Sequence, residues 1–373
     1  MTRRLLYLCD WLPPDFGAVG QYSLLFARAR AAGGEEVTLA GLSSTGDSEE
    51  SGEAGAGRLR VVRVRRPLYD RADLRRRAWW TLRTNLALLW RVRRELRRSD
   101  EVLFTGSPPF LLHFLVPLAA LLRRRLTYRI TDFHPECLIA ERLAAARRPA
   151  WWLRAFHRLT VALRRRVDRF EVLGEDQRRR LLDLGIPAQR IALKRDPSPV
   201  SIAPGVEPLE RPAALAGKSV LLYSGNFGVA HDHETFVAGY RRHHREGAGR
   251  VALWLNATGA KADLVEAALR REGLPVHRTR PLPLAELPRL LAAADAHLIT
   301  LRDEFVGYVL PSKVYACVES GAPILYVGSA ESDVHLLCAR GAAPYYRAAV
   351  GDAAAVARAL EAIAALATRP LAR

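Results

Sequence analysis

Cysteine is scarce in this chain: four residues, at positions 9, 137, 317 and 338, are spread over 373 residues with no CxxC pair. The scatter excludes a disulfide framework and a cysteine-based metal site, and it favours buried thiols in a reducing compartment. Long apolar runs are also absent. The longest, around residues 110–122, is interrupted by His113 and Pro117, and it is shorter than the ~18 residues of a membrane-spanning helix. Only five apolar residues separate Arg4 from Asp10, so we expect no signal peptide.

Positive charge is abundant but uneven. The chain holds 57 basic and 39 acidic residues, a net charge of +18, and residues 1–200 hold 38 of the basic and 22 of the acidic ones. The N-terminal half therefore favours an anionic surface. Arginine supplies almost all of the cations, and part of this excess reflects a general bias towards Arg, Ala and Leu. With 49% hydrophobic residues the chain can bury sizeable cores, which excludes wholesale disorder.

Short apolar segments alternate with helical patterns along the first half. Residues 4–9 predict a buried parallel strand, residues 21–32 a helix and residues 36–42 the next strand. A polar stretch rich in Gly, Ser and Glu over residues 43–57 predicts a loop. This succession predicts a doubly wound α/β domain.

Residues 197–215 are rich in proline and have no periodicity, which predicts a domain boundary there. The alternation restarts with a predicted strand at residues 219–223. We therefore predict an α/β chain of two Rossmann-like domains, residues 1–197 and residues 198–373, facing each other across a cleft. The ligand is expected in that cleft, at the carboxyl ends of the strands.

The most informative segment spans residues 304–324. It reads as an acidic loop with Gly307, then a proline and Ser312 opening a helix, then Lys313. Free amides in a first helical turn attract anions together with the helix dipole, and Lys313 adds a full positive charge. The segment therefore predicts a phosphate-binding site. A carboxylate at Glu304, placed to hold hydroxyl groups, extends this prediction to a nucleotide-sugar.

Two glycine-containing loops follow other predicted strands. In the first, Gly17 and Gly20 either let the backbone approach phosphates and a sugar or belong to an ordinary strand-to-helix loop. In the second, Gly225, Asn226 and Gly228 either face a phosphate or form a plain tight turn. The spacing in the first loop is not GxGxxG, so a dinucleotide fingerprint is not supported.

Histidine and acidic side chains stand near the predicted cleft. His231 and His233 follow the second glycine loop, where they could add positive charge if protonated or serve in packing. Asp132 and His134 follow a predicted strand and could orient or deprotonate an acceptor hydroxyl. The alternative is that Asp132 caps the next helix. Glu136 is expected to be a dipole partner in that turn.

Five short motifs stand in order along nearly the whole chain, at residues 13–20, 132–136, 223–228, 282–288 and 311–323. Together they resemble the motifs of GT-B-fold retaining glycosyltransferases of the large family 4 type, particularly the bacterial cell-surface polysaccharide subgroup with a Pro-Ser-Lys motif. Many members carry a second glutamate eight positions after the first, but here Ser312 stands eight positions after Glu304. The usual basic residue after the first strand of the second domain is also missing. Lys313 is therefore the main candidate to stabilise charge on a departing diphosphate.

The resemblance implies transfer of a sugar from a nucleotide-sugar with retention of configuration and without a cofactor. It implies that the N-terminal domain holds the acceptor, with a catalytic group near Asp132, that the C-terminal domain holds the donor, and that the last helix can pack back on the N-terminal domain. By the same resemblance, Thr258, Gly259, Pro281 and Leu282 would frame the base and ribose. No Asp-x-Asp pair stands in these motifs, so we expect no metal requirement.

Two basic segments mix tryptophan with arginine. The residues concerned are Trp79, Trp80, Arg83 and Trp90 in the first segment and Trp151 and Trp152 in the second. Amphipathic helices of this composition lie on anionic lipid surfaces, with Trp at the headgroups; the alternative is a core helix with a solvated Arg face. With the basic N-terminal half, the pattern predicts a peripheral position on the inner face of the membrane and a lipid-linked saccharide as acceptor.

Two other functions stay open. A nucleotide-sugar epimerase of the same fold would need neither an acceptor nor a membrane surface. A basic protein that binds polyanions would show salt-sensitive binding without turnover, although no nucleic-acid-binding module is visible and we expect no nucleic acid as partner. A catalytically inactive relative is also open, because the second glutamate and the usual basic residue are missing.

Overall fold

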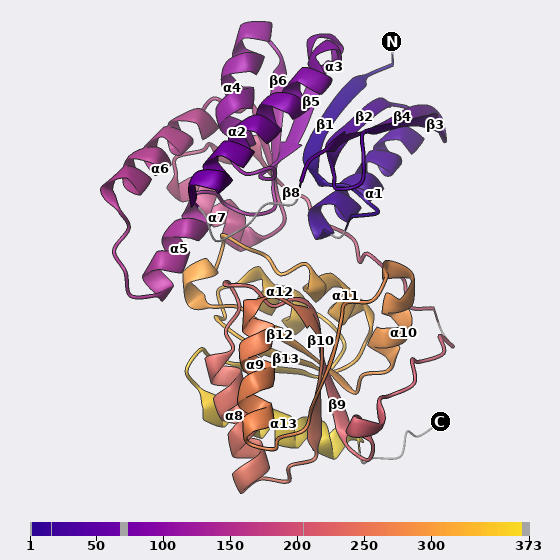
Figure 1. The fold of residues 1–373 in the computed structure, drawn as a ribbon, viewed down its shortest axis with the longest axis vertical. Coiled ribbons are helices and arrows are strands. Elements are labelled where there is room, and N and C mark those ends of the chain that lie inside the picture. Colours follow the sequence, from indigo (N-terminus) through magenta and orange to yellow (C-terminus); the bar gives the residue numbers. More distant parts are fainter. Residues whose placement is uncertain (1, 16, 68–73, 204, 368–373) are drawn as a thin grey trace. The chain divides into compact units, whose positions relative to one another are not determined.

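The structure, a computed structural model, describes residues 2–15, 17–67, 74–203 and 205–367. The chain divides into two compact units, residues 1–196 and residues 197–373 (Figure 1). Each unit is built on its own sheet, with helices packed against it.

The first unit has an eight-stranded sheet in the order β3-β4-β2-β1-β5-β6-β7-β8. All neighbouring strands are parallel except β3 and β4. The strand order changes direction between β1 and β5, and ligands of doubly wound sheets bind where this happens. In chain order the elements are β1 (Arg4–Trp11), α1 (Ala18–Ala32), β2 (Glu36–Ser43), β3 (Ser48–Ala54), β4 (Gly57–Arg65), α2 (Leu74–Arg91), α3 (Arg93–Arg98), β5 (Glu101–Thr105), α4 (Leu111–Leu122), β6 (Arg125–Ile130), α5 (Glu136–Ala144), α6 (Trp151–Arg164), β7 (Arg169–Val172), α7 (Glu175–Asp183), the 3-10 helix η1 (Ala188–Arg190) and β8 (Ile191–Leu193).

The polar stretch predicted as a loop over residues 43–57 contains an edge strand instead. β3 pairs antiparallel with β4, and its glutamates meet arginines of that strand: Glu49 lies 2.7 Å from Arg60, and Glu50 lies 2.7 Å from Arg63. Nearly all side chains of β3 are exposed. The loop prediction was wrong because cross-strand charge pairs, which hydrophobic alternation cannot reveal, accompany this strand.

A buried ion cluster joins the end of the first unit to its sheet. Arg129 on β6 donates hydrogen bonds to Glu171 on β7 (2.9 Å) and to Asp196 (2.5 Å), and Lys194 pairs with the same glutamate. Arg129, Glu171 and Asp196 are all buried. Since Asp196 is the last residue of the unit, the chain is held to β6 up to the domain boundary.

The second unit has a six-stranded parallel sheet in the order β11-β10-β9-β12-β13-β14, which is the 3-2-1-4-5-6 order of doubly wound nucleotide-binding folds. Its direction changes between β9 and β12. In chain order the elements are the 3-10 helix η2 (Ala213–Leu215), β9 (Ser219–Asn226), α8 (Glu234–Glu246), β10 (Val251–Thr258), α9 (Ala260–Arg271), β11 (Val276–Thr279), the 3-10 helix η3 (Leu284–Glu286), α10 (Leu287–Ala292), β12 (Ala296–Thr300), the 3-10 helix η4 (Asp303–Phe305), α11 (Lys313–Glu319), β13 (Ile324–Val327), α12 (Asp333–Ala339), β14 (Tyr345–Ala348) and α13 (Ala353–Ala367).

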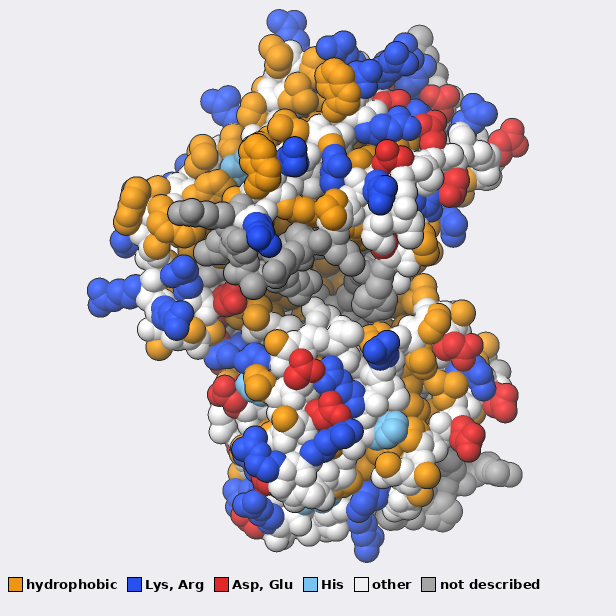
Figure 2. Space-filling view, in the orientation of Figure 1, with side chains coloured by type: hydrophobic (Ala, Val, Ile, Leu, Met, Phe, Trp, Pro, Cys, Tyr) orange, Lys and Arg blue, Asp and Glu red, His pale blue; other side chains and the backbone are white. Residues whose placement is uncertain are grey.

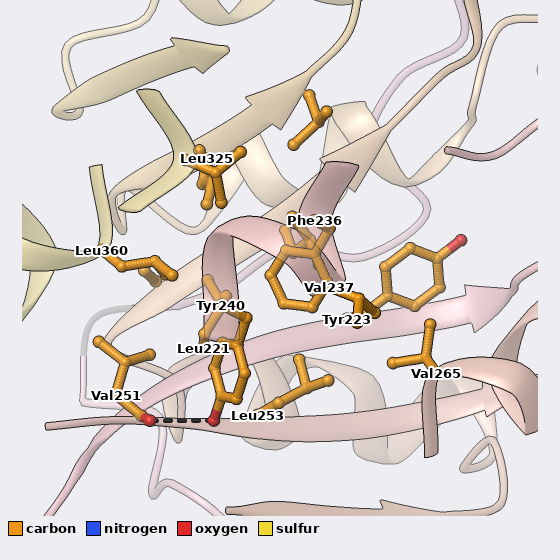
Figure 3. Close-up of a cluster of buried hydrophobic side chains, with 14 of the residues drawn as sticks. Leu221, Tyr223, Phe236, Val237, Tyr240, Val251, Leu253, Val265, Leu325 and Leu360 are labelled. Atoms are coloured by element: carbon orange, nitrogen blue, oxygen red, sulfur yellow. Dashed lines mark hydrogen bonds between the residues drawn. The ribbon is translucent and has the colours of Figure 1, made fainter. Parts of the chain in front are cut away.

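The larger core cluster of this unit lies between the sheet and helices α8, α9 and α13. Figure 3 shows Tyr240 of α8 among leucines and valines of the strands, with its hydroxyl donating to the carbonyl of Val251 (3.0 Å). Val356, Leu360 and Ile363 of α13 belong to the same cluster. The apolar side of the last helix is therefore buried within the second unit.

Candidate functional site

Two predicted loops meet at the carboxyl ends of β9 and β10. The amide of Phe227 donates to the carbonyl of Thr258 (2.7 Å), and the amide of Lys261 donates to the carbonyl of Phe227 (3.1 Å). Gly259 has a φ of +101°, and a Cβ there would lie 2.6 Å from the Phe227 carbonyl oxygen, so only glycine fits. The predicted residues in this cluster are Gly225, Asn226, Gly228, Thr258 and Gly259.

Lys313, the first residue of α11, points its amine at the end of β9. Its Nζ lies 3.3 Å from the ring centroid of Tyr223 and is shielded from solvent, and it has no hydrogen-bond partner among the described residues. A Cβ on Gly225 would lie 3.8 Å from Lys313 Cε, so the amine is next to the backbone at the end of β9. Burial lowers the pKa of Lys313 to about 7. A shielded amine that has no carboxylate partner within the described part of the chain is suited to an incoming anion.

Tyr223 was missed by sequence reasoning, because an aromatic residue in an apolar strand is typical of a core. Its ring stacks on Phe227 with 4.1 Å between centroids, and the edge of His231 completes the group. The electron-rich face of such a ring stabilises a cation. Tyr223 therefore supports a charged Lys313.

Positive charge and packing were the two alternatives for His231 and His233, and the structure decides between them for His231. His231 is buried, and its Nδ1 lies 2.6 Å from the carbonyl oxygen of Thr300. Burial and the nearby Lys313 lower the pKa of His231 to about 3, so the ring is neutral at pH 7. Burial and Lys261 also lower the pKa of His233. The expectation of positive charge is therefore wrong for His231.

The start of α11 differs from the prediction of free amides. The helix has only seven residues, and the amides of Val314 and Tyr315 already donate to the carbonyls of Pro311 (3.1 Å) and Ser312 (3.3 Å). Ser312 makes no side-chain cap. The prediction of free amides is therefore wrong for Val314 and Tyr315, and the lysine amine stays the candidate for attracting an anion here.

Glu304 and Gly307 lie in the segment that precedes α11. Glu304 belongs to η4, and one of its carboxylate oxygens lies 3.7 Å from Arg302. Gly307 is buried and has a φ of +76°, a conformation that favours glycine. A role of either residue in holding sugar hydroxyls stays a prediction.

A polar network joins the ends of β9, β10 and β11. Asn256 is buried, accepts a hydrogen bond from Ser224 and donates one to the carbonyl of Arg280. The predicted base-site residues Pro281 and Leu282 follow directly, and Leu282 also packs against a core cluster. Sequence reasoning did not select Asn256, although an asparagine inside an otherwise apolar strand was a signal available for it.

Asp132 follows β6 at the carboxyl end of the first sheet. Burial and then the negative charge of Asp10, which lies near the end of β1, raise the pKa of Asp132 to about 6. Such a carboxyl group is ionised at pH 7 and suited to accept a proton. The alternative of a helix cap is wrong, because α5 begins at Glu136 with Pro135 at its cap position. Sequence reasoning did not select Asp10.

The loop after Asp132 is held by a buried arginine. Arg164 of α6 donates to both carboxylate oxygens of Glu136 and to the carbonyl of His134 (2.9 Å). Its guanidinium also lies 5.1 Å from the ring centroid of Phe133. Burial alone would raise the pKa of Glu136. Hydrogen bonds from His157 and Arg164 outweigh this effect and lower the pKa to about 2. Glu136 is therefore an ion-pair partner more than a dipole partner.

Gly17 and Gly20 stand at the start of α1 in the first unit. Gly17 is extended, with φ −177°, and a Cβ there would find its nearest neighbour 3.8 Å away. Gly20 lies against the end of β1, where a Cβ would collide with the carbonyl of Trp11. Gly20 is thus required for packing of the helix on the strand, and contact of either glycine with a donor stays a prediction.

Helices α2, α4 and α6 carry an exposed apolar surface. Helix α4 contacts both α2 and α6 (Figure 1). Figure 2 shows hydrophobic and arginine side chains mixed over the first unit. Trp80 does not belong to this surface, because it stacks on Trp11 and donates to the carbonyl of Pro67. The exposed members, with their exposed fractions, are Trp79 (58%), Leu86 (52%) and Trp90 (70%) of α2, Leu121 (79%) of α4, and Trp151 (75%), Trp152 (49%) and Leu159 (51%) of α6.

Among the described residues, no three His, Cys, Asp or Glu side chains come together in a group that could hold a metal ion. Within the same residues, no helix combines the length and the apolar character that crossing a membrane requires. The expectations about metal and cofactor stay predictions.

No family model matches the chain. A curated relative, the probable glycosyltransferase WbjE of Pseudomonas aeruginosa, is 28% identical over 244 residues, which cover 62% of this chain and 58% of WbjE. The matched part is thus less than two thirds of that protein.

Solved structures resemble the chain over almost its full length. HepE from Anabaena in complex with UDP-glucose is 12% identical with a TM-score of 0.60, covering 98% of this chain and 94% of its own. The E. coli trehalose-6-phosphate structure bound with UDP-2-fluoro glucose is 13% identical with a TM-score of 0.62, covering 99% and 92%. WaaG, a glycosyltransferase involved in lipopolysaccharide biosynthesis, is 16% identical with a TM-score of 0.60, covering 97% and 90%. At these identities the likeness establishes the fold alone, and that fold is the two-domain α/β GT-B fold.

Proposed function

We propose that this protein is a glycosyltransferase that moves a sugar from a nucleotide-sugar to an acceptor hydroxyl. The observation that carries the proposal is the amine of Lys313. It is shielded from solvent, it has no hydrogen-bond partner in the part of the chain that the structure describes, and it lies beside Gly225 at the switch point of a GT-B-type sheet. The names and bound nucleotide-sugars of the similar proteins support it.

In this proposal the residues of the second unit act on the donor. Lys313 stabilises the negative charge that develops on the diphosphate as the sugar departs, which is electrostatic catalysis in a site with little water. Glu304 and the backbone near Gly307 hold sugar hydroxyls. The loop after Arg280 holds the base. Retention of configuration and placement in family 4 with the Pro-Ser-Lys subgroup rest on the motif resemblance.

The acceptor is proposed to bind the first unit. Asp132, with its raised pKa of about 6, orients the acceptor hydroxyl and accepts its proton. His134 lies in the same loop, and its predicted part in orienting or deprotonating the acceptor hydroxyl stays a second candidate role beside that of Asp132. Glu136 holds that loop through Arg164.

The donor is tested by a thermal-shift panel of UDP-, GDP-, ADP- and TDP-sugars. A ligand that binds the folded state raises the melting temperature. A free ligand concentration of 100 times the Kd raises the free energy of unfolding by about 2.7 kcal/mol. We expect one nucleotide class to raise it clearly and the others to have little effect. Absence of any shift, together with tight salt-sensitive binding to DNA or RNA, would refute the transferase and favour the polyanion-binding alternative.

The acceptor is further proposed to be a lipid-linked saccharide of cell-envelope polysaccharide biosynthesis, met at the inner face of the membrane. The exposed surface over α2, α4 and α6 supports this placement. Arg83 lies over Trp79 (5.3 Å to the ring centroid) and Arg93 over Trp90 (4.4 Å). Tryptophan paired with arginine matches the boundary between lipid headgroups and acyl chains.

Replacing Trp90 and Trp151 together by serine is expected to weaken binding to anionic vesicles by roughly tenfold or more, because burial of one large apolar side chain contributes about 1.5–3 kcal/mol. The measurement is cosedimentation with phosphatidylglycerol vesicles, repeated with neutral phosphatidylcholine and with added salt. Leu264→Ser is the matched control, since Leu264 is 51% exposed on α9 of the second unit. Equal binding by wild type and both variants would remove this surface from the proposal.

A further inference from the structure

Three polar side chains stand next to one another across the end of the second sheet. In the register of the parallel strands, Asn256 of β10 is paired with Ser224 of β9 on one side and with Thr279 of β11 on the other. Residues in register on parallel neighbours point to the same face of a sheet. The three side chains therefore form a row, with Asn256 in the middle.

The amide of Asn256 uses its donors and its acceptor in this row. Its Nδ2 donates to Thr279 Oγ1 (2.9 Å) and to the carbonyl of Arg280 (2.6 Å), and its Oδ1 accepts from Ser224 Oγ (3.2 Å). Trp254 donates to the same Thr279 hydroxyl (3.1 Å). The two hydrogen bonds donated by Nδ2 and the one that Oδ1 accepts from the Ser224 hydroxyl fix the orientation of the amide.

The row connects two parts of the chain that sequence reasoning selected independently. Ser224 precedes Gly225, the residue that faces Lys313. Arg280 precedes Pro281 and Leu282, where the base and ribose are expected. The Asn256 amide is the described side chain that bonds to both parts.

Packing alone does not explain an asparagine at this position. Asn256 is 1% exposed, and a buried amide destabilises a fold unless its hydrogen bonds are made. An apolar side chain of similar size would fill the space without that requirement, but it would leave the Arg280 carbonyl without this donor. What the amide adds to the strand pairing is a hydrogen-bonded connection from the Arg280 carbonyl to Ser224 at the end of β9.

We propose that Asn256 is a positioning residue of the donor site, which holds the base-binding segment after Arg280 at a fixed distance from Gly225 and Lys313. The inference rests on the proposed function and deepens it. One bound nucleotide-sugar would span both parts, with its diphosphate at Lys313 and its base at the Arg280 segment. Pre-organisation of such a site raises affinity, because binding then does not have to supply the free energy for ordering the loop.

The test is Asn256→Asp in the full-length protein, with donor affinity measured by titration calorimetry from pH 5 to pH 8 with the nucleotide-sugar selected by the thermal-shift panel. The aspartate keeps the acceptor for Ser224 but loses both donors, and when ionised it repels the Arg280 carbonyl oxygen. We expect Kd at pH 8 to rise roughly tenfold, with kcat changed little. At pH 5 the protonated acid can donate one hydrogen bond, so part of the affinity is expected to return. The comparison is the ratio of the variant's Kd to the wild-type Kd at each pH, because Lys313, with a pKa of about 7, changes the affinity of both proteins.

A second variant keeps the inference testable if Asn256→Asp does not fold. Thr279→Val removes one acceptor from Asn256 and leaves the Arg280 carbonyl bond, so we expect a smaller rise of Kd, about threefold. A lower melting temperature with unchanged donor Kd in the folded variants would mean a merely structural role and would overturn the inference. If wild type binds no nucleotide-sugar, the proposed function fails first, and that result is distinct from equal binding by wild type and variants.

Discussion

Lys313→Met is expected to lose donor binding and, at the same time, to make the second unit harder to unfold. Methionine fills the space of the lysine stem without its charge, so nothing at this position attracts the diphosphate. Loss of one electrostatic contact to a developing charge lowers rates by roughly 10²–10³-fold. Initial rates and donor Kd, measured with the nucleotide-sugar of the panel, check this part.

The gain in stability follows from the lowered pKa of Lys313. Its pKa in the folded protein is about 7, against 10.5 for an ordinary lysine. Between these values the unfolded chain binds a proton that the folded chain lacks, so the stability of wild type rises with pH over this range. At pH 7 and below, folding must bury a charge, and methionine removes that requirement. The advantage of the variant is therefore expected to be largest below pH 7 and to disappear towards pH 10.

The matched control is Lys218→Met, because Lys218 precedes the opposite end of β9, where its amine donates to the carbonyl of Gly249 (3.1 Å). This variant should keep wild-type donor affinity. Urea unfolding at several pH values gives the free energies for both variants. An unchanged donor Kd in folded Lys313→Met would refute the assignment of the diphosphate to this amine.

Arg164→Met is expected to destabilise the first unit by roughly 3–5 kcal/mol, because it leaves the buried carboxylate of Glu136 without its main partner. The carbonyl of His134 loses a donor in the same variant. The free energy of unfolding from urea titration measures the effect. The loop that carries Asp132 is expected to lose its fixed position as well, so the transfer rate should fall even in molecules that remain folded.

A double variant separates the buried charge from the packing. Arg164→Met with Glu136→Leu replaces the ion pair by apolar side chains, an exchange that is often neutral, so much of the stability should return. Acid gives a second check. Glu136 has a folded-state pKa of about 2, so its ion pair contributes fully above the ordinary pKa of about 4.3 and is lost as the pH falls towards 2. The deficit of Arg164→Met should therefore shrink as the pH falls from about 4.3 towards 2, and a deficit independent of pH in that range would contradict the argument.

The sequence predicted the alternating architecture, and it also singled out glycines and a lysine whose placement depends on local pattern. A glycine at the end of a strand or a lysine after a proline is visible in sequence. In the structure Gly225 lies at the end of β9, Gly259 directly follows β10, and Lys313 lies next to Gly225. The assumption of free amides at Val314 and Tyr315 failed because a short helix can begin with a turn that uses them.

What the sequence could not provide was the surroundings of each side chain. The charge on His231 depends on its burial and on a lysine 82 positions away in sequence, and the role of Gly20 depends on the carbonyl of Trp11. Trp79 and Trp80 are neighbours with the same composition around them, yet one is 58% exposed and the other stacks on Trp11. Such differences arise only when distant segments pack together.

The buried cluster of Arg129 has a mechanical consequence. Asp196, immediately before the second unit, is bonded to Arg129, which lies on β6 three residues before Asp132. A force that pulls on the chain at Pro197 is therefore shared between the backbone that leads to β8 and this ion pair, which passes part of it to β6. Part of any tension on Pro197 thus reaches the strand that precedes the proposed catalytic carboxylate.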